Sequence, residues 1–409
     1  MLRDVVIVDM ARSAVGKHGG TVKELPALEL LTPVARAVIE RNKAKVKPEM
    51  YDYVLVGQVK QNTSCANIAR NLVLNVGLPE EVPASSMSIA CGSGLLAMME
   101  GYEMICNGFA DIILAGGCES MSGSEYFISG KANQAFGTGN IEIKDSLIAG
   151  GPGAVPEERY GNLPMGITAE NLAAIHHISR EEQDKFALRS QTLALKAIAE
   201  GDFKAEIVPI PYQKPDGSIG FFKVDEYPRE TSMETMAKLK PSFKKDGLVT
   251  AANSSGRNDG AGIALLMSRE KAEELGLKPR ARYVAGSIAG VDPSIMGRGP
   301  VPATQKAMEK AGLTLKDMDL IELNEAFAAQ SLAVYREWQE TWGVSREWFD
   351  EHVNRWGGAI AIGHPLGGSG AIITTKLLNG LERTGGRYGL STLCCGGGIG
   401  VACIIERLD

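Results

Sequence analysis

The chain has 409 residues, of which 44% are hydrophobic and 22% charged, a balance typical of a folded globular protein and not of a disordered one. Its 43 basic and 49 acidic residues give a net charge of −6 without long charged blocks, which argues against nucleic acid or an anionic membrane surface as a partner. A length of this size predicts two or three domains, at roughly 100–200 residues each. We therefore expect a small-molecule partner.

The N-terminal segment predicts a short strand and no targeting signal. Charged residues lie directly beside the apolar run Val5–Val8, and the apolar stretch of a signal peptide is missing. Three longer uncharged segments are interrupted by Gly, Ser or Pro, so we expect no membrane-spanning helix at 82–99, 356–375 or 388–405. Seven cysteines without a Cys-x-x-Cys pair argue against a disulfide framework and a zinc site. A cytoplasmic protein without a bound metal is expected.

Strand-like and helix-like segments alternate along the chain, which predicts the α/β class. Val5–Val8, Tyr53–Val56 and Ile112–Ala115 are apolar runs typical of strands buried on both faces. Residues 95–108 carry apolar side chains at helical spacing. Ser179 and the glutamate three residues later form a capping-box pattern, which predicts that another helix begins there.

The order of segments predicts two similarly built halves. Gly92-Ser93-Gly94 precedes a helix and then the strand 111–116, and Gly368-Ser369-Gly370 precedes the helix 371–381 and the strand 388–394. We expect a first core half at 1–118, completed by about 250–275, and a second at 276–409. Residues 119–249, richer in charge, Gly and Pro, are expected to form an inserted loop domain that contributes ligand contacts.

Cys91 is the first candidate catalytic residue. It lies between a predicted strand and a predicted helix, so the N–H groups of the helix are expected to face its sulfur and lower its pKa. A thiolate of this kind is a nucleophile, and the glycines beside it allow a substrate to approach. Two alternatives are a buried structural cysteine and a dinucleotide fingerprint at Gly92-x-Gly94-x-x-Ala97. The latter is weak because Asp111 begins the next strand and does not end it.

Three further segments carry polar groups among apolar or glycine residues. His364, in GGAIAIGHPLG, can act as a base near pH 7 and then as a donor to an oxyanion, although a structural core histidine is the alternative. Cys394 precedes the run 396–398 of glycines, whose N–H groups can bind an anion. Asn324 and Glu325 follow the apolar run 320–323. For this pair of residues, the alternative to a functional role is that they cap a helix.

Together these segments resemble the thiolase family, the acetyl-CoA C-acyltransferases. The resemblance spans nearly the whole chain and rests on motifs in family order: VVIVDMARSAVGKHGG, Cys91-Gly-Ser-Gly, AGGCESMS, Met165–Asn171, Gly247–Gly256, NEAFA, GGAIAIGHPLG and Cys394-x-Gly-Gly-Gly. It implies a five-layered α-β-α-β-α core of two duplicated halves with an inserted loop domain. It also implies assembly as a homodimer or homotetramer.

The resemblance assigns a role to each catalytic candidate. Cys91 would accept the acyl group, His364 would deprotonate it, and Cys394 would be the acid/base acting on carbon 2 of the acetyl unit. Asn324 would hold a water that forms one oxyanion hole with His364, and the N–H groups of Cys91 and Gly396 would form the other. Coenzyme A would be a co-substrate and no cofactor would be bound permanently. The CoA contacts implied are Met165, Arg229, Phe243, Ser255 and Phe327.

The implied reaction is cleavage of a 3-ketoacyl-CoA to acetyl-CoA and a shortened acyl-CoA, or the reverse Claisen condensation. Ser88, Leu96 and Cys118 depart from the usual family residues, and Pro164 replaces a histidine common in acetoacetyl-specific members, so longer or bulkier acyl groups are expected. Residues 338–356 carry four tryptophans and predict a packed helix pair. The alternatives are an acetoacetyl-CoA-specific acetyltransferase, a ketoacyl synthase, in which a histidine would replace Cys394, and a non-catalytic thiolase-like carrier.

Overall fold

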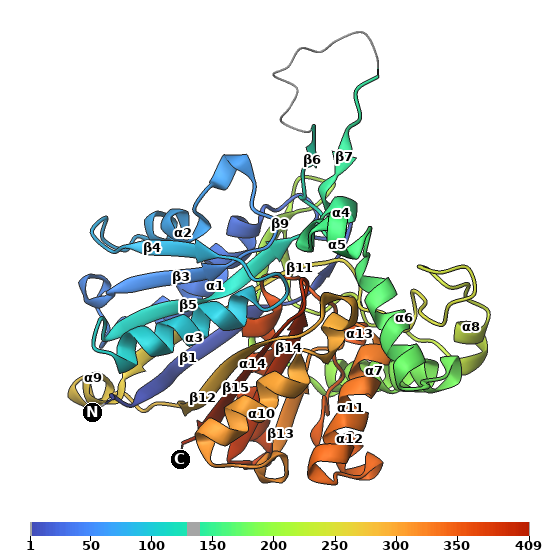
Figure 1. The fold of residues 1–409 in the computed structure, drawn as a ribbon. Helices are drawn as coiled ribbons and strands as arrows, with labels where there is room; N and C mark the ends of the chain where they lie inside the picture. The colour runs from blue at the N-terminus through green and yellow to red at the C-terminus, as the bar shows by residue number, and fades with distance from the viewer. Residues whose placement is uncertain (1, 129–139, 409) are drawn as a thin grey trace.

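The computed structural model describes residues 2–128 and 140–408, and its core is one continuous mixed sheet flanked by helices (Figure 1). The buried, largely β-branched and apolar strands predicted from the sequence form its centre. Along the sheet the strands follow the order β13 (Leu320–Leu323), β14 (Tyr388–Cys395), β15 (Ile399–Arg407), β12 (Ala281–Gly290), β1 (Val5–Ser13), β11 (Asn258–Ser268), β5 (Ile112–Ser120), β3 (Tyr53–Gly57) and β4 (Ala84–Met87).

The sheet consists of two halves with the same connectivity, as the sequence pattern predicts. In the first half β1 pairs antiparallel with β11, β11 antiparallel with β5, and β5 parallel with β3. In the second half β12 pairs antiparallel with β15, β15 antiparallel with β14, and β14 parallel with β13. The halves meet at two residue pairs between β1 and β12, Val6 with Arg282 and Ile7 with Ala281. The predicted duplication is confirmed.

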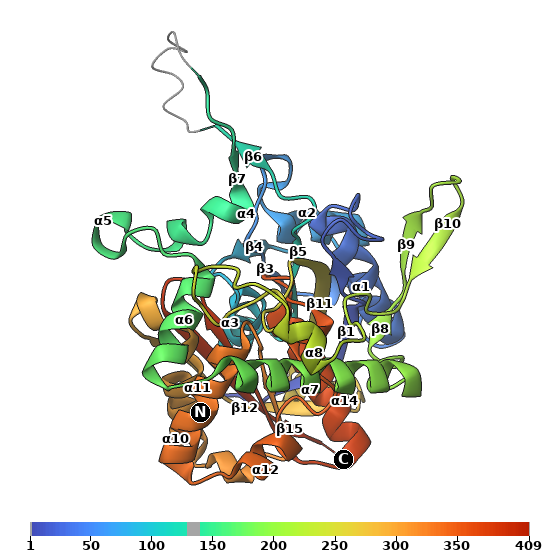
Figure 2. The ribbon, with the colours of Figure 1, turned by 90° about the vertical axis from the view of Figure 1, so that its right-hand side faces the viewer.

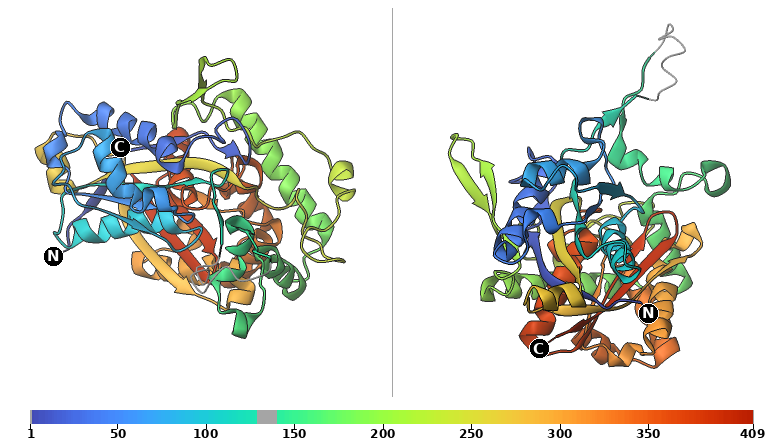
Figure 3. Two further views of the ribbon diagram at one scale, coloured as in Figure 1. Left: turned by 90° about the horizontal axis from the view of Figure 1, so that it is seen from above. Right: turned by 90° about the vertical axis from the view of Figure 1, so that its left-hand side faces the viewer.

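The two half-sheets form two layers of the core, and helices form the other three. Between the two half-sheets, α3 (Ser93–Cys106) and α14 (Ser369–Thr384) pack against each other, and their apolar residues share one core with both halves. On the outer face of the first half lie α1 (Ala27–Asn42) and α2 (Ile68–Val76). On that of the second lie α10 (Pro300–Ala311) and α11 (Ala328–Trp342). The five-layered architecture follows from this order (Figure 3).

The predicted inserted region carries two longer helices, α6 and α7, that pack against the core of the second half, together with several short elements. Two hairpin-like pairs extend from the body in Figure 2, and one strand, β8, joins the main sheet beside β1. Buried Arg12 on β1 anchors this region through ion pairs with Glu206 at 2.7 Å and Asp225 at 2.8 Å. The elements here are β6 (Tyr126–Phe127), β7 (Lys144–Asp145), α4 (Ser146–Ala149), α5 (Glu157–Tyr160), α6 (Met165–Ile175), α7 (Arg180–Glu200), β8 (Ile207–Val208), β9 (Ile210–Gln213), β10 (Ile219–Phe222) and α8 (Met233–Ala237).

Local sequence signals predict some element ends correctly and others only approximately. Ser179 caps α7 and forms a capping box with Glu182, as predicted. Strand β5 is longer than expected, because it runs on to Ser120 and places Cys118 and Glu119 on the strand. The tryptophan-rich segment forms a helix pair in which Trp338 is fully buried. Among the described residues, no helix is long and apolar enough to cross a membrane. The remaining elements are β2 (Gly16–Lys17), α9 (Arg269–Glu274), α12 (Arg346–His352) and α13 (Ala359–Ile362).

Candidate active site

Cys91 lies in a tight turn between β4 and α3, and its sulfur faces two backbone N–H groups. Those groups belong to Gly396 and to Cys91 itself, and both hydrogen bonds lower the pKa of the thiol. The preceding residue, Ala90, has a φ of 55°, a left-handed conformation that is uncommon outside glycine. The Ser93 hydroxyl donates to the Ala90 carbonyl at 2.6 Å, which fixes the turn. The nucleophile is thus presented by a strained but well-supported turn.

The pKa of Cys91 is nevertheless raised, to about 11, so the lowering predicted from the helix N-terminus is wrong. Loss of solvation is the largest cause, and the nearby negative charge of Glu119 adds to it. The two N–H groups offset only part of this effect. At neutral pH Cys91 is therefore a thiol and not a thiolate, and it needs a base to become a nucleophile.

His364 is buried, with 3% of its surface exposed, and its tautomer is fixed by Ser369. The Ser369 hydroxyl donates its single proton to the Pro365 carbonyl at 2.9 Å, so its oxygen accepts from His364 Nδ1–H at 2.6 Å. This arrangement leaves a lone pair on Nε2. Burial lowers the pKa of His364 to about 4, so the ring is neutral at pH 7 and Nε2 can take a proton.

Asn324 lies beside the basic nitrogen of His364. Its Nδ2 is 3.4 Å from His364 Nε2, and its Oδ1 is buried without a hydrogen-bond partner among the described residues. A buried acceptor of this kind costs about 1–3 kcal/mol unless a donor reaches it. The geometry suits the bound water that the family resemblance implies for Asn324.

Cys394 lies at the end of β14, where it is fully buried and close to Cys91. Burial raises the pKa of Cys394 well above its usual value, and a negative charge on Cys91 raises it further. The next residue, Cys395, points to the opposite face of the strand, as strand alternation requires. Its sulfur would lie 2.6 Å from a Cβ at Gly92. Burial and a negative charge on Cys91 raise the pKa of Cys395 as they do that of Cys394, so both thiols lie near Cys91, although they pack into different core clusters.

Glycines bring the His364 loop directly against the start of α3. A Cβ at Gly94 would lie 2.5 Å from the Gly367 carbonyl oxygen, and a Cβ at Gly117 would lie 2.1 Å from it. Real side chains do not fit such distances, so backbone packs on backbone at this contact. The loops of Cys91 and His364 are joined here without intervening side chains.

Two buried polar residues that the sequence reasoning missed fix the position of His364. Asn258 on β11 accepts a hydrogen bond from the His364 N–H at 2.9 Å, and Ser369 fixes the ring as described. Glu325 holds the segment before the histidine, because it accepts hydrogen bonds from Asn354 Nδ2 at 2.8 Å and from the Ile360 N–H at 3.3 Å. The position of Ser369 at the N-terminus of a helix near His364 was a usable signal, whereas nothing local marks Asn258.

The structure brings four of the five predicted CoA contacts together. Met165 Sδ would lie 3.6 Å from a Cβ at Gly396, which places it at the catalytic centre. The Phe243 ring packs over the backbone of residue 166 and meets Phe327 edge to face, with centroids 6.0 Å apart. The N–H of Ser255 donates to the carbonyl of residue 326, next to Phe327, at 3.0 Å.

Arg229, the fifth predicted CoA contact, is joined to this group only indirectly, through Tyr227, whose ring would lie 2.4 Å from a Cβ at Gly256, next to Ser255. Its N–H donates to Gln191 Oε1 at 2.9 Å, and its guanidinium lies over the Tyr227 ring, 4.9 Å from the centroid. Within the described ranges, no hydrogen bond or ring contact joins Arg229 to the other four residues.

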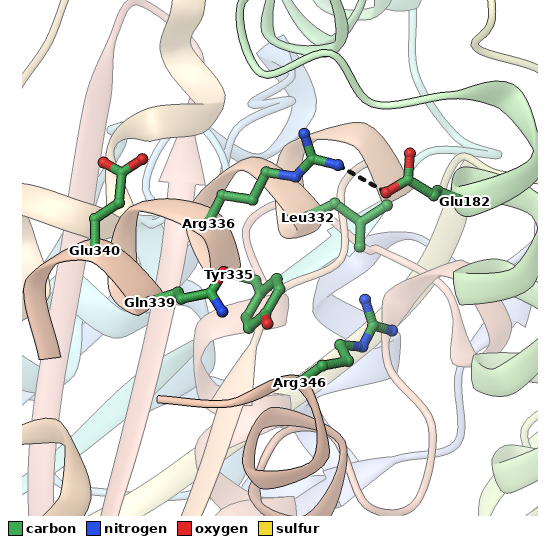
Figure 4. Close-up of a pocket in the computed structure, with 7 residues that line it drawn as sticks. All are labelled: Glu182, Leu332, Tyr335, Arg336, Gln339, Glu340 and Arg346. Carbon is green, nitrogen blue, oxygen red and sulfur yellow. Dashed lines mark hydrogen bonds and ion pairs between the residues drawn. The ribbon is translucent and has the colours of Figure 1, made fainter. Parts of the chain in front are cut away.

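Two surface pockets lie away from these residues. One, of about 370 Å³, lies between α11 and the starts of α7 and α12, and an ion pair between Arg336 and Glu182 crosses it at 2.7 Å (Figure 4). The other, of about 650 Å³, lies beside Trp356. Neither is lined by a predicted catalytic or CoA-binding residue. In the part of the chain that the structure describes, no cluster of three or more His, Cys, Asp or Glu could hold a metal ion.

The centre combines a thiol facing two N–H groups, a neutral imidazole with a free lone pair, and a second thiol close to the first. These groups can carry an acyl unit as a thioester and move protons around it. Fold and site thus define the chain as an enzyme of the acyltransferase class.

Comparison with known proteins identifies the family. Residues 5–270 match the thiolase N-terminal domain and residues 277–407 the thiolase C-terminal domain. An acetyl-CoA acetyltransferase of Syntrophomonas wolfei is 46% identical over the full length of both chains. The crystal structure of the Bacillus anthracis acetyl-CoA acetyltransferase has a TM-score of 0.92 at 42% identity and covers 100% of this chain and 99% of that one. The human mitochondrial 3-ketoacyl-CoA thiolase in complex with CoA has a TM-score of 0.91 at 42% identity, covering 100% and 98%. The chain belongs to the thiolase family.

Proposed function

We propose that the protein is a thiolase that cleaves 3-ketoacyl-CoA with coenzyme A, or catalyses the reverse Claisen condensation, through an acyl-Cys91 intermediate. The observation that carries the proposal is the placement of the Cys91 sulfur in front of the N–H groups of Cys91 and Gly396, with Cys394 close by. The relatives named acetyl-CoA acetyltransferase and 3-ketoacyl-CoA thiolase support the same activity.

The first half-reaction begins with a proton transfer. The Cys91 thiol gives its proton to His364 Nε2, which is neutral and has a free lone pair, and the sulfur then attacks the C3 carbonyl of the substrate. Donors at the Asn324 and His364 side and at the Cys91 and Gly396 side stabilise the oxyanions that develop. The C2–C3 bond breaks with its electron pair on C2, and the Cys394 thiol protonates that carbon. Acetyl-CoA leaves.

The second half-reaction removes the acyl group. The thiol of a second coenzyme A gives its proton to the Cys394 thiolate that the first half-reaction produced. The coenzyme A sulfur then attacks the acyl-Cys91 thioester. Cys91 leaves as a thiolate, which the protonated His364 neutralises. Each residue thus regains its starting protonation state, Cys394 by taking the proton of the second coenzyme A. Each step moves only protons and electron pairs among the groups named, so the scheme requires no redox cofactor and coenzyme A acts as a co-substrate.

We also propose that the chain acts as a homodimer or homotetramer. Strand β4 is an edge of the main sheet, its four residues are only half-buried, and it leads directly to Cys91. The segment around β6, β7 and α4 exposes the apolar side chains Tyr126, Ile143 and Ile148. Both features are typical of surfaces that a second copy covers. The cytoplasmic location and the domain boundaries stay predictions.

The test is a series of CoA-dependent cleavage rates for 3-ketoacyl-CoAs of graded acyl size. We expect activity above acetoacetyl-CoA, because Pro164 caps α6 beside Met165 where a histidine is common in acetoacetyl-specific members. Cys91→Ser should abolish turnover, and Cys106→Ser, a half-buried thiol at the other end of α3, should leave it intact. Activity on acetoacetyl-CoA alone would favour the acetyltransferase alternative, and no cleavage of any substrate would favour the carrier.

A further inference from the structure

Glu119 is a fully buried carboxylate that the proposed mechanism does not use. It lies near the end of β5, and its two oxygens accept three backbone hydrogen bonds. Oε2 accepts from the N–H of Gly367 at 3.0 Å and of Val59 at 3.1 Å, and Oε1 accepts from the N–H of Lys60 at 3.0 Å. One carboxylate therefore ties the His364 loop to the loop that follows β3.

The same carboxylate is close to the nucleophile. Its negative charge raises the pKa of Cys91, and the Gly367 carbonyl packs on the start of the helix that follows Cys91. Gly367 is three residues beyond His364 along the chain. Glu119 thus bears on both partners of the first proton transfer.

We propose that Glu119 is a positioning residue of the thiolase reaction, and that its ionised carboxylate holds the His364 loop in register with Cys91. Three N–H groups converge on two oxygens, and an ionised carboxylate is a strong acceptor for all three. A protonated acid is a weaker acceptor through its hydroxyl oxygen, and an amide would turn a donor toward at least one of these N–H groups. The inference rests on the proposed function.

Burial raises the pKa of Glu119 to about 7, whereas the three N–H groups and the Lys60 ammonium lower it. The other titratable groups facing this site are the thiols of Cys91 and Cys118. Lys60 is itself influenced by Asp145 and Arg257. A carboxyl with a raised pKa gains a proton as the pH falls through about 7, so the contacts weaken below that pH. His364, with its pKa near 4, does not titrate in this range.

The test compares the wild-type protein with Glu119→Gln across pH 5.5 to 9. We expect the wild-type kcat/KM for thiolysis to fall below about pH 7, and we expect Glu119→Gln to be about 10- to 100-fold slower at pH 8 without that inflection. The KM for CoA should change less than about twofold, since Glu119 touches no predicted CoA contact. The matched control is Asp52→Asn, which alters a carboxylate that accepts two N–H bonds at the opposite end of β5.

A second variant keeps the carboxylate in place. Lys60→Met removes the cation that favours ionised Glu119, so it should move the inflection to higher pH. Wild-type rates and an unchanged inflection in Glu119→Gln, or an unmoved inflection in Lys60→Met, would overturn the inference. The rate of Cys91 alkylation by iodoacetamide, measured at each pH, separates the two proposals. An alkylation inflection near pH 7 without thiolysis would refute the proposed function and retain the role of Glu119.

Discussion

Removing the Ser369 hydroxyl tests how the catalytic base is prepared. In Ser369→Ala the His364 Nδ1–H loses its acceptor at 2.6 Å, deep in the protein. Leaving a buried donor unsatisfied costs about 1–3 kcal/mol. The ring can avoid this cost by moving its proton to Nε2, but it then cannot accept the Cys91 proton. Since 1.4 kcal/mol is tenfold in an equilibrium constant, the competent tautomer becomes roughly 5- to 150-fold rarer.

We therefore expect kcat/KM for thiolysis to fall by that factor in Ser369→Ala, with little change in the KM for CoA. Steady-state kinetics with a 3-ketoacyl-CoA measures it, and Ser369→Thr should restore part of the rate. The control is Thr375→Val on the same helix, which removes a comparable buried hydroxyl that donates to the Ala371 carbonyl at 2.7 Å and does not contact His364. A folded Ser369→Ala protein with wild-type kcat/KM would refute the reasoning, as would an equal loss in Thr375→Val.

Three further predictions concern the second thiol, the CoA surface and the buried histidine. Cys394→Ala should lower both thiolysis and condensation by about 10²–10⁴-fold while acetyl transfer from acetyl-CoA to Cys91 persists; an equally large loss of acetyl transfer, measured by rapid-quench kinetics, would contradict its role as acid on carbon 2. Phe243→Ala, which removes a ring packed on residue 166 and Phe327, should raise the KM for CoA several-fold with kcat unchanged; a pure kcat effect would contradict it. The pKa of His364 is about 4 in the folded protein and 6.5 in the unfolded chain. Its contribution to the free energy of unfolding, up to about 3 kcal/mol, is therefore present above pH 6.5 and lost as the pH falls toward 4. Urea unfolding should therefore show wild type losing more stability than His364→Asn between pH 7 and 4.5, and parallel losses would argue against a buried neutral imidazole.

The features predicted correctly from the sequence are those that local patterns encode. Gly92-Ser93-Gly94 and Gly368-Ser369-Gly370 mark equivalent helix starts, and the two helices do pack together at the centre of a duplicated sheet. The Ser179 capping box needs only neighbouring residues. Backbone physics over a few residues is sufficient for such features.

The features that were missed depend on contacts between distant segments. The pKa of Cys91 was predicted with the wrong sign, because burial by remote elements outweighs the two N–H groups beside the sulfur. Asn258 reaches His364 from 106 positions away, and Glu119 reaches Gly367 from 248. The motif AGGCESMS contains Glu119, but its partners are visible only when the two loops are placed together.

The most direct test of the account is to incubate the protein with acetyl-CoA, quench it in acid and map the modified peptide by mass spectrometry. We predict one acetyl group on Cys91 in the wild-type protein and in Cys394→Ala. We predict none in Cys91→Ser and none on the control thiol Cys106. An unmodified Cys91, or an acetyl group carried by another cysteine, would contradict the central claim that Cys91 is the nucleophile that accepts the acyl group.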